Sequence, residues 1–212
     1  MTLLMILLCI TGQSSNDEES SYSHGFRLGI GLTTSIPSMQ MEKEYADMNS
    51  EAGIGYDLST FAGGTSIELL GDLSERLRIR GSVGVTEFKG EYRNTLIILD
   101  DRAISVEAQA YFLLNRGKDI SFSAGAGPTY TWVRRNLNSF YTSTSGSGSG
   151  FGLVTSIRLD QEWPWKIGNI SILMALEAGY RLNNIKLDNE EADGFELDFS
   201  GPFLKIGSYI GL

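Results

Sequence analysis

The stretch that decides the fold is Ile104-Ser-Val-Glu-Ala-Gln-Ala-Tyr-Phe-Leu-Leu114, which a turn at residues 115–119 joins to a second alternating segment, residues 120–133. In both segments apolar side chains alternate with polar or small ones, the pattern of a strand with one apolar and one polar face. Each segment is longer than ten residues, whereas a strand usually has about five or six. The sequence therefore predicts a hairpin that spans a membrane as one quarter of a closed barrel.

Composition limits the alternatives. The chain has 212 residues, 42% of them hydrophobic and 20% charged, which suits one domain and excludes a disordered chain. No run approaches the roughly 18 apolar residues that a spanning helix needs, so any crossing of a membrane has to be made by strands. The net charge of −9 argues against nucleic acid as a partner.

The N-terminal segment predicts export. Residues 1–12 contain an apolar run followed by Thr11 and Gly12, which predicts a truncated signal peptide. It lacks the usual basic start, and the alternative is a short buried strand. We expect residues 13–23 to form a polar leader and residues 24–212 to form the barrel. Cys9 is the only cysteine, so cleavage after Gly12 leaves no thiol for a disulfide or for catalysis.

Eight alternating segments follow one another along the chain. They are residues 26–33, 61–69, 77–85, 104–114, 120–133, 151–159, 170–182 and 204–212. Their connections alternate in length, with long loops expected at 35–51, 91–102, 136–150 and 183–196. This organisation predicts an all-β, eight-stranded antiparallel up-and-down transmembrane β-barrel with four long external loops and three short periplasmic turns. The Gly/Ser tract at residues 142–150 favours a slack linker over a mobile gate.

Two barrels fit this alternation: a soluble lipocalin-like barrel with an apolar interior and a membrane barrel with a polar one. Charge decides between them, because a Lys or Arg that faces the middle of a bilayer costs about 2–4 kcal/mol. Glycines that share the polar face would make room for the guanidinium groups in a narrow lumen. We therefore predict a charge network in the lumen, formed by Arg27, Glu68, Arg78, Arg80, Glu107, Arg158, Glu177, Arg181 and Lys205. For this network the sequence favours a structural plug over a narrow ion path.

Aromatic residues cluster near the predicted strand ends, where membrane barrels carry interface girdles. The set comprises Phe26, Phe88, Phe112, Tyr130, Trp132, Phe151, Trp163, Trp165, Tyr180 and Phe203.

The strand pattern, the two-strand unit Ile67-Glu-Leu-Leu-Gly-Asp-Leu-Ser-Glu-Arg-Leu-Arg-Ile79 and the closing Phe203-Leu-Lys-Ile-Gly-Ser-Tyr-Ile-Gly-Leu212 carry a family resemblance. The chain resembles the small eight-stranded outer-membrane barrels of Gram-negative bacteria, of the OmpA/OmpX type, and the broader porin-like β-barrels. The resemblance implies an integral outer-membrane protein exported through a signal peptide. It also implies outer-membrane lipid, the barrel-assembly machinery and an extracellular partner of the long loops as contacts. The family usually ends in an aromatic residue, whereas this chain ends in Leu212.

Catalytic signals are weak. Barrels of this size that edit lipid A resemble one another in using a His with a Ser and an acid, but the single histidine, His24, precedes the first strand on the predicted periplasmic side. Asn189, Glu191 and Asp193 have EF-hand-like spacing, but Ser200 stands where the bidentate Glu is needed, which favours a solvated acidic loop. We therefore expect no catalytic, cofactor or metal site. The expected role is structural or in surface interaction; a soluble or periplasmic ligand-binding barrel and a narrow porin-like channel are the alternatives.

Overall fold

A computed structural model describes residues 25–36, 62–92, 97–117, 119–138, 143–163, 170–188 and 196–211. The predicted signal peptide, the polar leader, His24 and most of the first long loop lie outside these residues. Within the described ranges there is no helix of the length and apolar character needed to cross a membrane.

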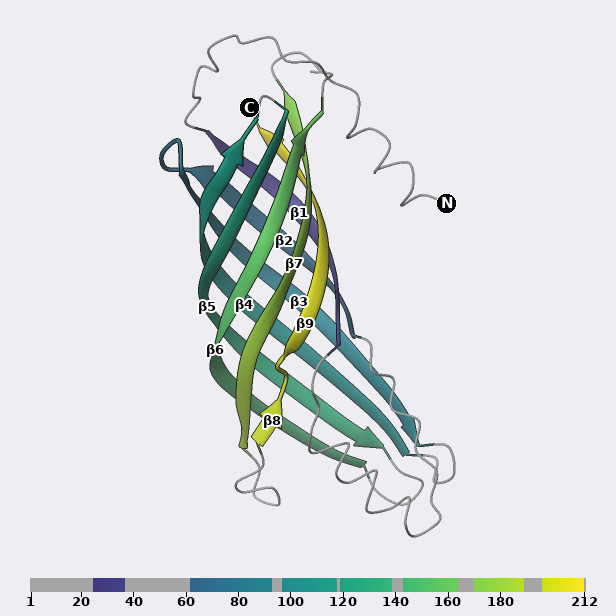
Figure 1. Ribbon diagram of the computed structural model, residues 1–212. Coiled ribbons are helices and arrows are strands. Elements are labelled where there is room, and N and C mark those ends of the chain that lie inside the picture. Colours follow the sequence, from purple (N-terminus) through teal and green to yellow (C-terminus); the bar gives the residue numbers. More distant parts are fainter. Residues whose placement is uncertain are drawn as a thin grey trace.

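The described residues form one closed barrel of tilted antiparallel strands (Figure 1). The strands are β1 (Phe26–Ser35), β2 (Ala62–Asp72), β3 (Leu77–Tyr92), β4 (Ile97–Arg116), β5 (Ile120–Asn138), β6 (Ser143–Glu162), β7 (Ser171–Asp188), β8 (Glu196–Asp198) and β9 (Gly201–Gly211). Consecutive strands pair from β1 to β7, and β9 pairs with both β7 and β1 to close the barrel. The short β8 pairs with β7 in the same register as β9, so β8 and β9 are two parts of one strand interrupted at Phe199 and Ser200. The described chain therefore confirms the predicted eight-stranded closed barrel.

Several strands are longer than the sequence pattern predicted. β3 and β4 pair as far as Tyr92 and Ile97, and β5 and β6 as far as Asn138 and Ser143. The prediction of long loops at 91–102 and 136–150 is therefore wrong for most of these residues, which belong to strands. The Gly/Ser tract, predicted as a slack linker, lies almost entirely in β6. Its Gly and Ser residues have low strand propensity, but the backbone hydrogen bonds to β5 hold them in the ladder. β7 likewise runs on to Asp188, into the predicted fourth loop.

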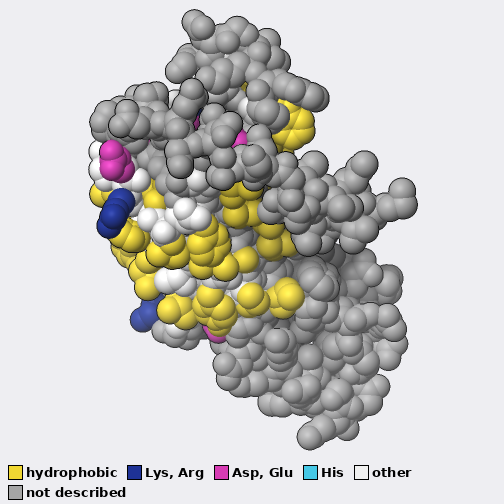
Figure 2. Space-filling model, turned by 45° about the horizontal axis from the view of Figure 1, so that its top comes forward, with side chains coloured by type: hydrophobic (Ala, Val, Ile, Leu, Met, Phe, Trp, Pro, Cys, Tyr) yellow, Lys and Arg dark blue, Asp and Glu magenta, His cyan; other side chains and the backbone are white. Residues whose placement is uncertain are grey.

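The apolar parity of each strand faces outward. Leu28, Ile30 and Phe151 are 61%, 65% and 80% exposed, and hydrophobic side chains cover much of the wall seen in Figure 2. Soluble monomers rarely expose an apolar surface this continuous. The orientation predicted from the alternation is the one observed.

The interior changes character along the barrel. At the end that holds the tight turns, Leu70, Leu173, Ala175 and Tyr209 form a buried apolar cluster. Charged side chains fill the middle. Towards the opposite end the rings of Phe88 and Phe199 lie 4.9 Å apart. Phe88 and Phe203, predicted to belong to an interface girdle, are instead buried inside, at 6% and 5% exposure, because they follow the inward parity of their strands.

Aromatic rings lie over glycines that are their direct cross-strand partners. Tyr209 pairs with Gly29, Tyr111 with Gly125 and Phe203 with Gly179. A Cβ added to these glycines would lie 2.3, 2.5 and 2.6 Å from a carbon of the facing ring. The prediction that glycines make room for guanidinium groups is wrong at these three positions, since rings occupy the space. Such pairs compensate for the weak strand propensity of glycine.

Candidate functional site: the charge network of the lumen

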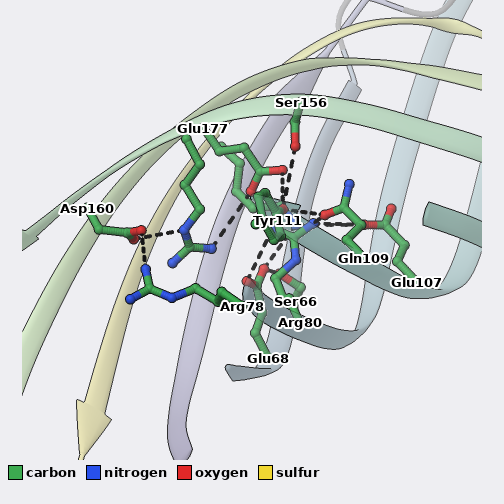
Figure 3. Close-up of polar contacts among 12 residues, drawn as sticks. Ser66, Glu68, Arg78, Arg80, Glu107, Gln109, Tyr111, Ser156, Asp160 and Glu177 are labelled. Carbon is green, nitrogen blue, oxygen red and sulfur yellow. Dashed lines mark hydrogen bonds and ion pairs between the residues drawn. The ribbon is translucent and has the colours of Figure 1, made fainter. Parts of the chain in front are cut away.

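Arg80 of β3 lies at the centre of the interior polar contacts (Figure 3). Its guanidinium group donates hydrogen bonds to Glu177 of β7 and to the side-chain oxygen of Gln109 of β4. Its Nη2 lies 3.4 Å from Glu107 Oε2, and its Nη1 lies 3.6 Å from Glu68 Oε2. One buried cation therefore joins carboxylates from three strands.

Two further arginines share one carboxylate. Arg158 Nε donates to Asp160 Oδ1 at 2.7 Å, and Arg78 Nη1 donates to Asp160 Oδ2 at 2.5 Å. Arg78 also pairs with Asp72, with Nε 2.5 Å from Oδ1. Arg158 donates to the Tyr209 hydroxyl at 2.9 Å, and that hydroxyl donates to Glu68. These contacts connect the apolar cluster at the turn end to the central carboxylates.

Lys205 and Arg181 complete the network towards the opposite end. Lys205 Nζ lies 2.9 Å from Glu68 Oε1 and 3.9 Å from Glu107 Oε2. Arg181 donates to Glu107, and its guanidinium carbon lies 5.5 Å from the ring centre of Phe203. Arg27 lies at the turn end, where it pairs with the partly exposed Glu162.

Tyr111 acts as a polar and aromatic bridge in the interior. Its hydroxyl lies within hydrogen-bond distance of the Gln109 side-chain oxygen and, at 3.0 Å, of Glu177 Oε1, the two acceptors open to its single proton. The guanidinium carbons of Arg80 and Arg158 lie 5.6 and 5.8 Å from its ring centre, within the range of cation–π attraction. The ring over Gly125 thus also stabilises the two most buried arginines.

The sequence-predicted residues include six cations but only three acids. The described structure adds three acidic partners, Asp72, Asp160 and Glu162, so that these contacts join six cations to six carboxylates. It also adds Gln109, Tyr111 and Tyr209. The alternation contains the signal for most of these, since Asp160 stands two residues after Arg158, and Gln109 and Tyr111 follow Glu107 on the same parity. Asp72 and Glu162 were missed because their positions were assigned to turns.

A second interior ion pair, which the sequence reading also missed, lies beyond the network. Arg135 Nε and Nη2 donate to the buried carboxylate of Asp101 at 2.9 and 2.6 Å, a bidentate arrangement. Nearby, Ser105 and Thr131 share a hydrogen bond of 2.9 Å, and Asn183 donates to Thr131 at 2.8 Å. Polar pairing therefore continues along the interior beyond the predicted residues.

The interior leaves little room for a ligand at its centre. A cavity of ≈ 20 Å³ beside Glu107, Arg181 and Lys205 has space for about one water molecule. Among the described residues no group of three or more His, Cys, Asp or Glu side chains could hold a metal ion. The three residues with EF-hand-like spacing, Asn189, Glu191 and Asp193, lie outside the described residues. Ser200, at the twelfth position, is described, and its hydroxyl accepts a hydrogen bond of 3.0 Å from the backbone amide of Asn183.

The outward apolar wall and the ion-paired interior define an eight-stranded barrel of the type found in bacterial outer membranes. Ail, the attachment invasion locus protein of Yersinia pestis, is similar, with 18% identity, a TM-score of 0.53, and 90% of this chain and 100% of that chain covered; one structure holds the heparin analogue sucrose octasulfate. OprG of Pseudomonas aeruginosa has 11% identity, a TM-score of 0.56 and coverage of 92% and 99%.

A major outer membrane protein of Thermus thermophilus gives 11% identity, a TM-score of 0.53 and coverage of 90% and 100%. No protein-family model matches the sequence, and no curated protein is significantly similar to it. At these identities the similarity shows the fold.

Proposed function

We propose that this protein is an integral outer-membrane barrel with a non-enzymatic role in the structure of the envelope or in surface interaction, and that its ion network closes the lumen. The observation that carries the proposal is the division of the wall into an exposed apolar face and an interior of paired charges. Outer-membrane lipid and the barrel-assembly machinery are the contacts we expect, with an extracellular partner at the end opposite the termini. The non-enzymatic part rests on the sequence, whose single histidine precedes the first strand.

The direction of the apolar face favours this proposal over a lipocalin-like ligand-binding barrel. A ligand-binding barrel of that class needs an apolar interior. Here Ile67 is 65% exposed, whereas its neighbour Glu68 is 1% exposed. Such a wall is stable when lipid covers its outside and when the inward charges neutralise one another.

The contacts of the network favour a plug over a channel. Arg80 and Arg158 are fully buried, and each bonds to groups from other strands. An ion that crossed the lumen would have to break these contacts, each of which replaces hydration that the buried charges have lost.

Cell fractionation tests the location. We expect the protein in detergent-extracted outer membrane, as a band whose gel mobility changes after heating, because a closed barrel resists detergent until it is heated. Release of the protein by osmotic shock would contradict the membrane assignment and would support the soluble alternative.

Planar-bilayer recording tests the plug. The wild-type barrel should give no conductance steps at the nanosiemens scale. A variant that replaces both Arg80 and Glu177 with Ala should conduct more than the wild type, since it opens the centre of the network and removes both charges of one pair. Nanosiemens steps from the wild type would overturn the plug in favour of the channel.

A further inference from the structure

Arg102 of β4 and Arg134 of β5 lie directly opposite one another on the outer wall. Both side chains are exposed, and among the described residues neither guanidinium group has a hydrogen-bond or ion-pair partner. Like charges that face one another across antiparallel strands are destabilising. One residue along each strand, on the inner face, Asp101 and Arg135 form a bidentate pair. Strand pairing alone therefore gives no reason for the outer pair.

The two arginines mark the border of the apolar wall. The next outward residues are Ile104 on β4 and Trp132 on β5, which are 42% and 46% exposed. Tyr130 continues this apolar face, with its ring centre 4.5 Å from that of Trp132. Aromatic residues of membrane barrels lie at the level of the lipid headgroups. The arginine pair therefore lies at headgroup depth, at the barrel end opposite the termini.

A groove of ≈ 560 Å³ connects the pair to the apolar wall. Its lining includes Arg102, Ile104, Trp132, Arg134, Ser147 and Ser149. The hollow lies over the Gly/Ser part of β6, where small side chains pair with the bulky Trp132 and Arg134. One side of the groove thus offers guanidinium and hydroxyl groups, and the other offers an apolar surface.

We propose that this groove binds the phosphate of a phosphorylated lipid headgroup in the outer leaflet; the inference rests on the proposed function. A guanidinium group matches phosphate through two parallel N–H···O bonds, and two of them match a doubly charged phosphate monoester. The bound phosphate also removes the repulsion between the arginines. The acyl chains of the same lipid would continue over Ile104 and Trp132.

Among the side chains that the structure describes, nearby acids do not neutralise the pair. Glu87 of β3 lies opposite Arg102, and Asp100 lies two residues before it on the same face. In the described part of the chain neither acid forms an ion pair with Arg102 or Arg134. Two cations at one border position therefore remain available to an anionic headgroup.

Lipid retention on the full-length barrel tests the site. The barrel is folded into phosphatidylcholine nanodiscs that contain either bis-phosphorylated lipid A or lipid A without its phosphates, and native mass spectrometry counts the lipid that stays bound. We expect the wild type to retain the phosphorylated form. Removal of each arginine, by R102Q, R134Q or both, should weaken retention about tenfold per residue. R76Q, which removes an exposed arginine from the β2–β3 turn at the other end, is the matched control and should behave as wild type.

R134E separates the site from the stability of the barrel. It should abolish retention of the phosphorylated lipid while raising the resistance of the barrel to heat, because the introduced carboxylate would face Arg102 as an opposite charge. A variant that loses lipid by unfolding would lose both properties together.

Several outcomes would overturn the inference. Equal retention by wild type and R102Q/R134Q, or retention of the lipid without phosphates, would remove the site. Displacement of the lipid by inorganic phosphate would assign the groove to a free anion, and a dimer mass that depends on the arginines would assign it to a second copy. If the wild type folds into nanodiscs as a heat-modifiable barrel but retains no lipid A, only this inference fails; if it does not fold there, the proposed function fails as well.

Discussion

Arg134 and Arg135 are adjacent in β5, but the two faces of the wall give them opposite surroundings. Arg135 points inward and forms a bidentate pair with Asp101, whereas Arg134 points outward and faces Arg102. Elsewhere in the barrel the inward cations also have carboxylate partners, several of them from distant strands, whereas the outer border carries a like-charged pair. The inner face pairs its charges within the barrel, whereas the outer pair has no partner among the described residues.

The largest effect should come from breaking the inner face at its centre. Arg80→Ala leaves Glu177, Glu107 and Glu68 buried without their shared cation. We expect the free energy of unfolding to fall by about 3–5 kcal/mol. A urea titration of the barrel in lipid vesicles measures this free energy, with the heat-modifiable gel shift as the readout of the folded fraction. A loss no larger than that of the exposed-turn variant R76Q would contradict the central place of Arg80.

Glycines on the two faces provide the next comparison. A Cβ added to Gly127 would lie 1.8 Å from the backbone oxygen of Ala108, whereas one added to Gly81 on the outer face meets nothing within 4 Å. Gly127→Ala should therefore destabilise the barrel by about 1–3 kcal/mol, and Gly81→Ala should stay within about 0.5 kcal/mol of wild type. Similar unfolding curves for the two variants would argue against the close approach of β4 and β5.

Tyrosine hydroxyls on the two faces should differ by a smaller amount. Tyr209→Phe removes a buried hydroxyl that accepts from Arg158 and donates to Glu68, at an expected cost of about 1–2 kcal/mol. Tyr180 is 44% exposed on the outer face, so Tyr180→Phe should have little effect. The same urea titration compares them, and equal midpoints would show that the Tyr209 hydroxyl contributes nothing to the network.

The smallest effect is a gain in stability. In lipid without phosphate monoesters, Arg134→Glu should raise the free energy of unfolding by about 0.2–1 kcal/mol, because a like-charged pair becomes an opposite one. Arg134→Gln, which removes the repulsion without adding an attraction, is the control and should gain less. A decrease for both variants would show that Arg134 stabilises the wall by itself.

Strand number, side-chain orientation and most of the interior arginines could be predicted from alternation, whereas Arg135 lies beyond the end of the predicted strand. Alternation decides which residues share a face, because successive side chains of a strand point to opposite sides. It decides less well where a strand ends. Ser143–Gly150 reads as a linker on its own and becomes a strand because β5 supplies a partner for its whole length.

The partners of the interior charges were harder to predict than the charges. Asp72 and Glu162 lie at strand ends that read as turns, so the sequence suggested an excess of positive charge in the lumen. The rings over Gly29, Gly125 and Gly179 depend on the register between strands, which alternation does not specify. Tyr111 and Tyr209 share the inward parity of their strands, but their contacts follow from that register.

The distribution of the charge network along the chain has a consequence for assembly. Arg80 lies in β3, its partner Glu177 lies in β7, and the Tyr209 hydroxyl that links Arg158 to Glu68 comes from β9. Arg78 and Arg80 find some of their carboxylates in β2 and β4, but Arg27 pairs with Glu162 of β6, and the pairing of Arg80 is complete only with Glu177 of β7. Strands inserted one after another would bring incompletely paired guanidinium groups towards lipid, where a fully unpaired one costs about 2–4 kcal/mol. We therefore expect closure of the barrel and entry into the membrane to be coupled, because β9, which closes the barrel against β1 and β7, also supplies the Tyr209 contact.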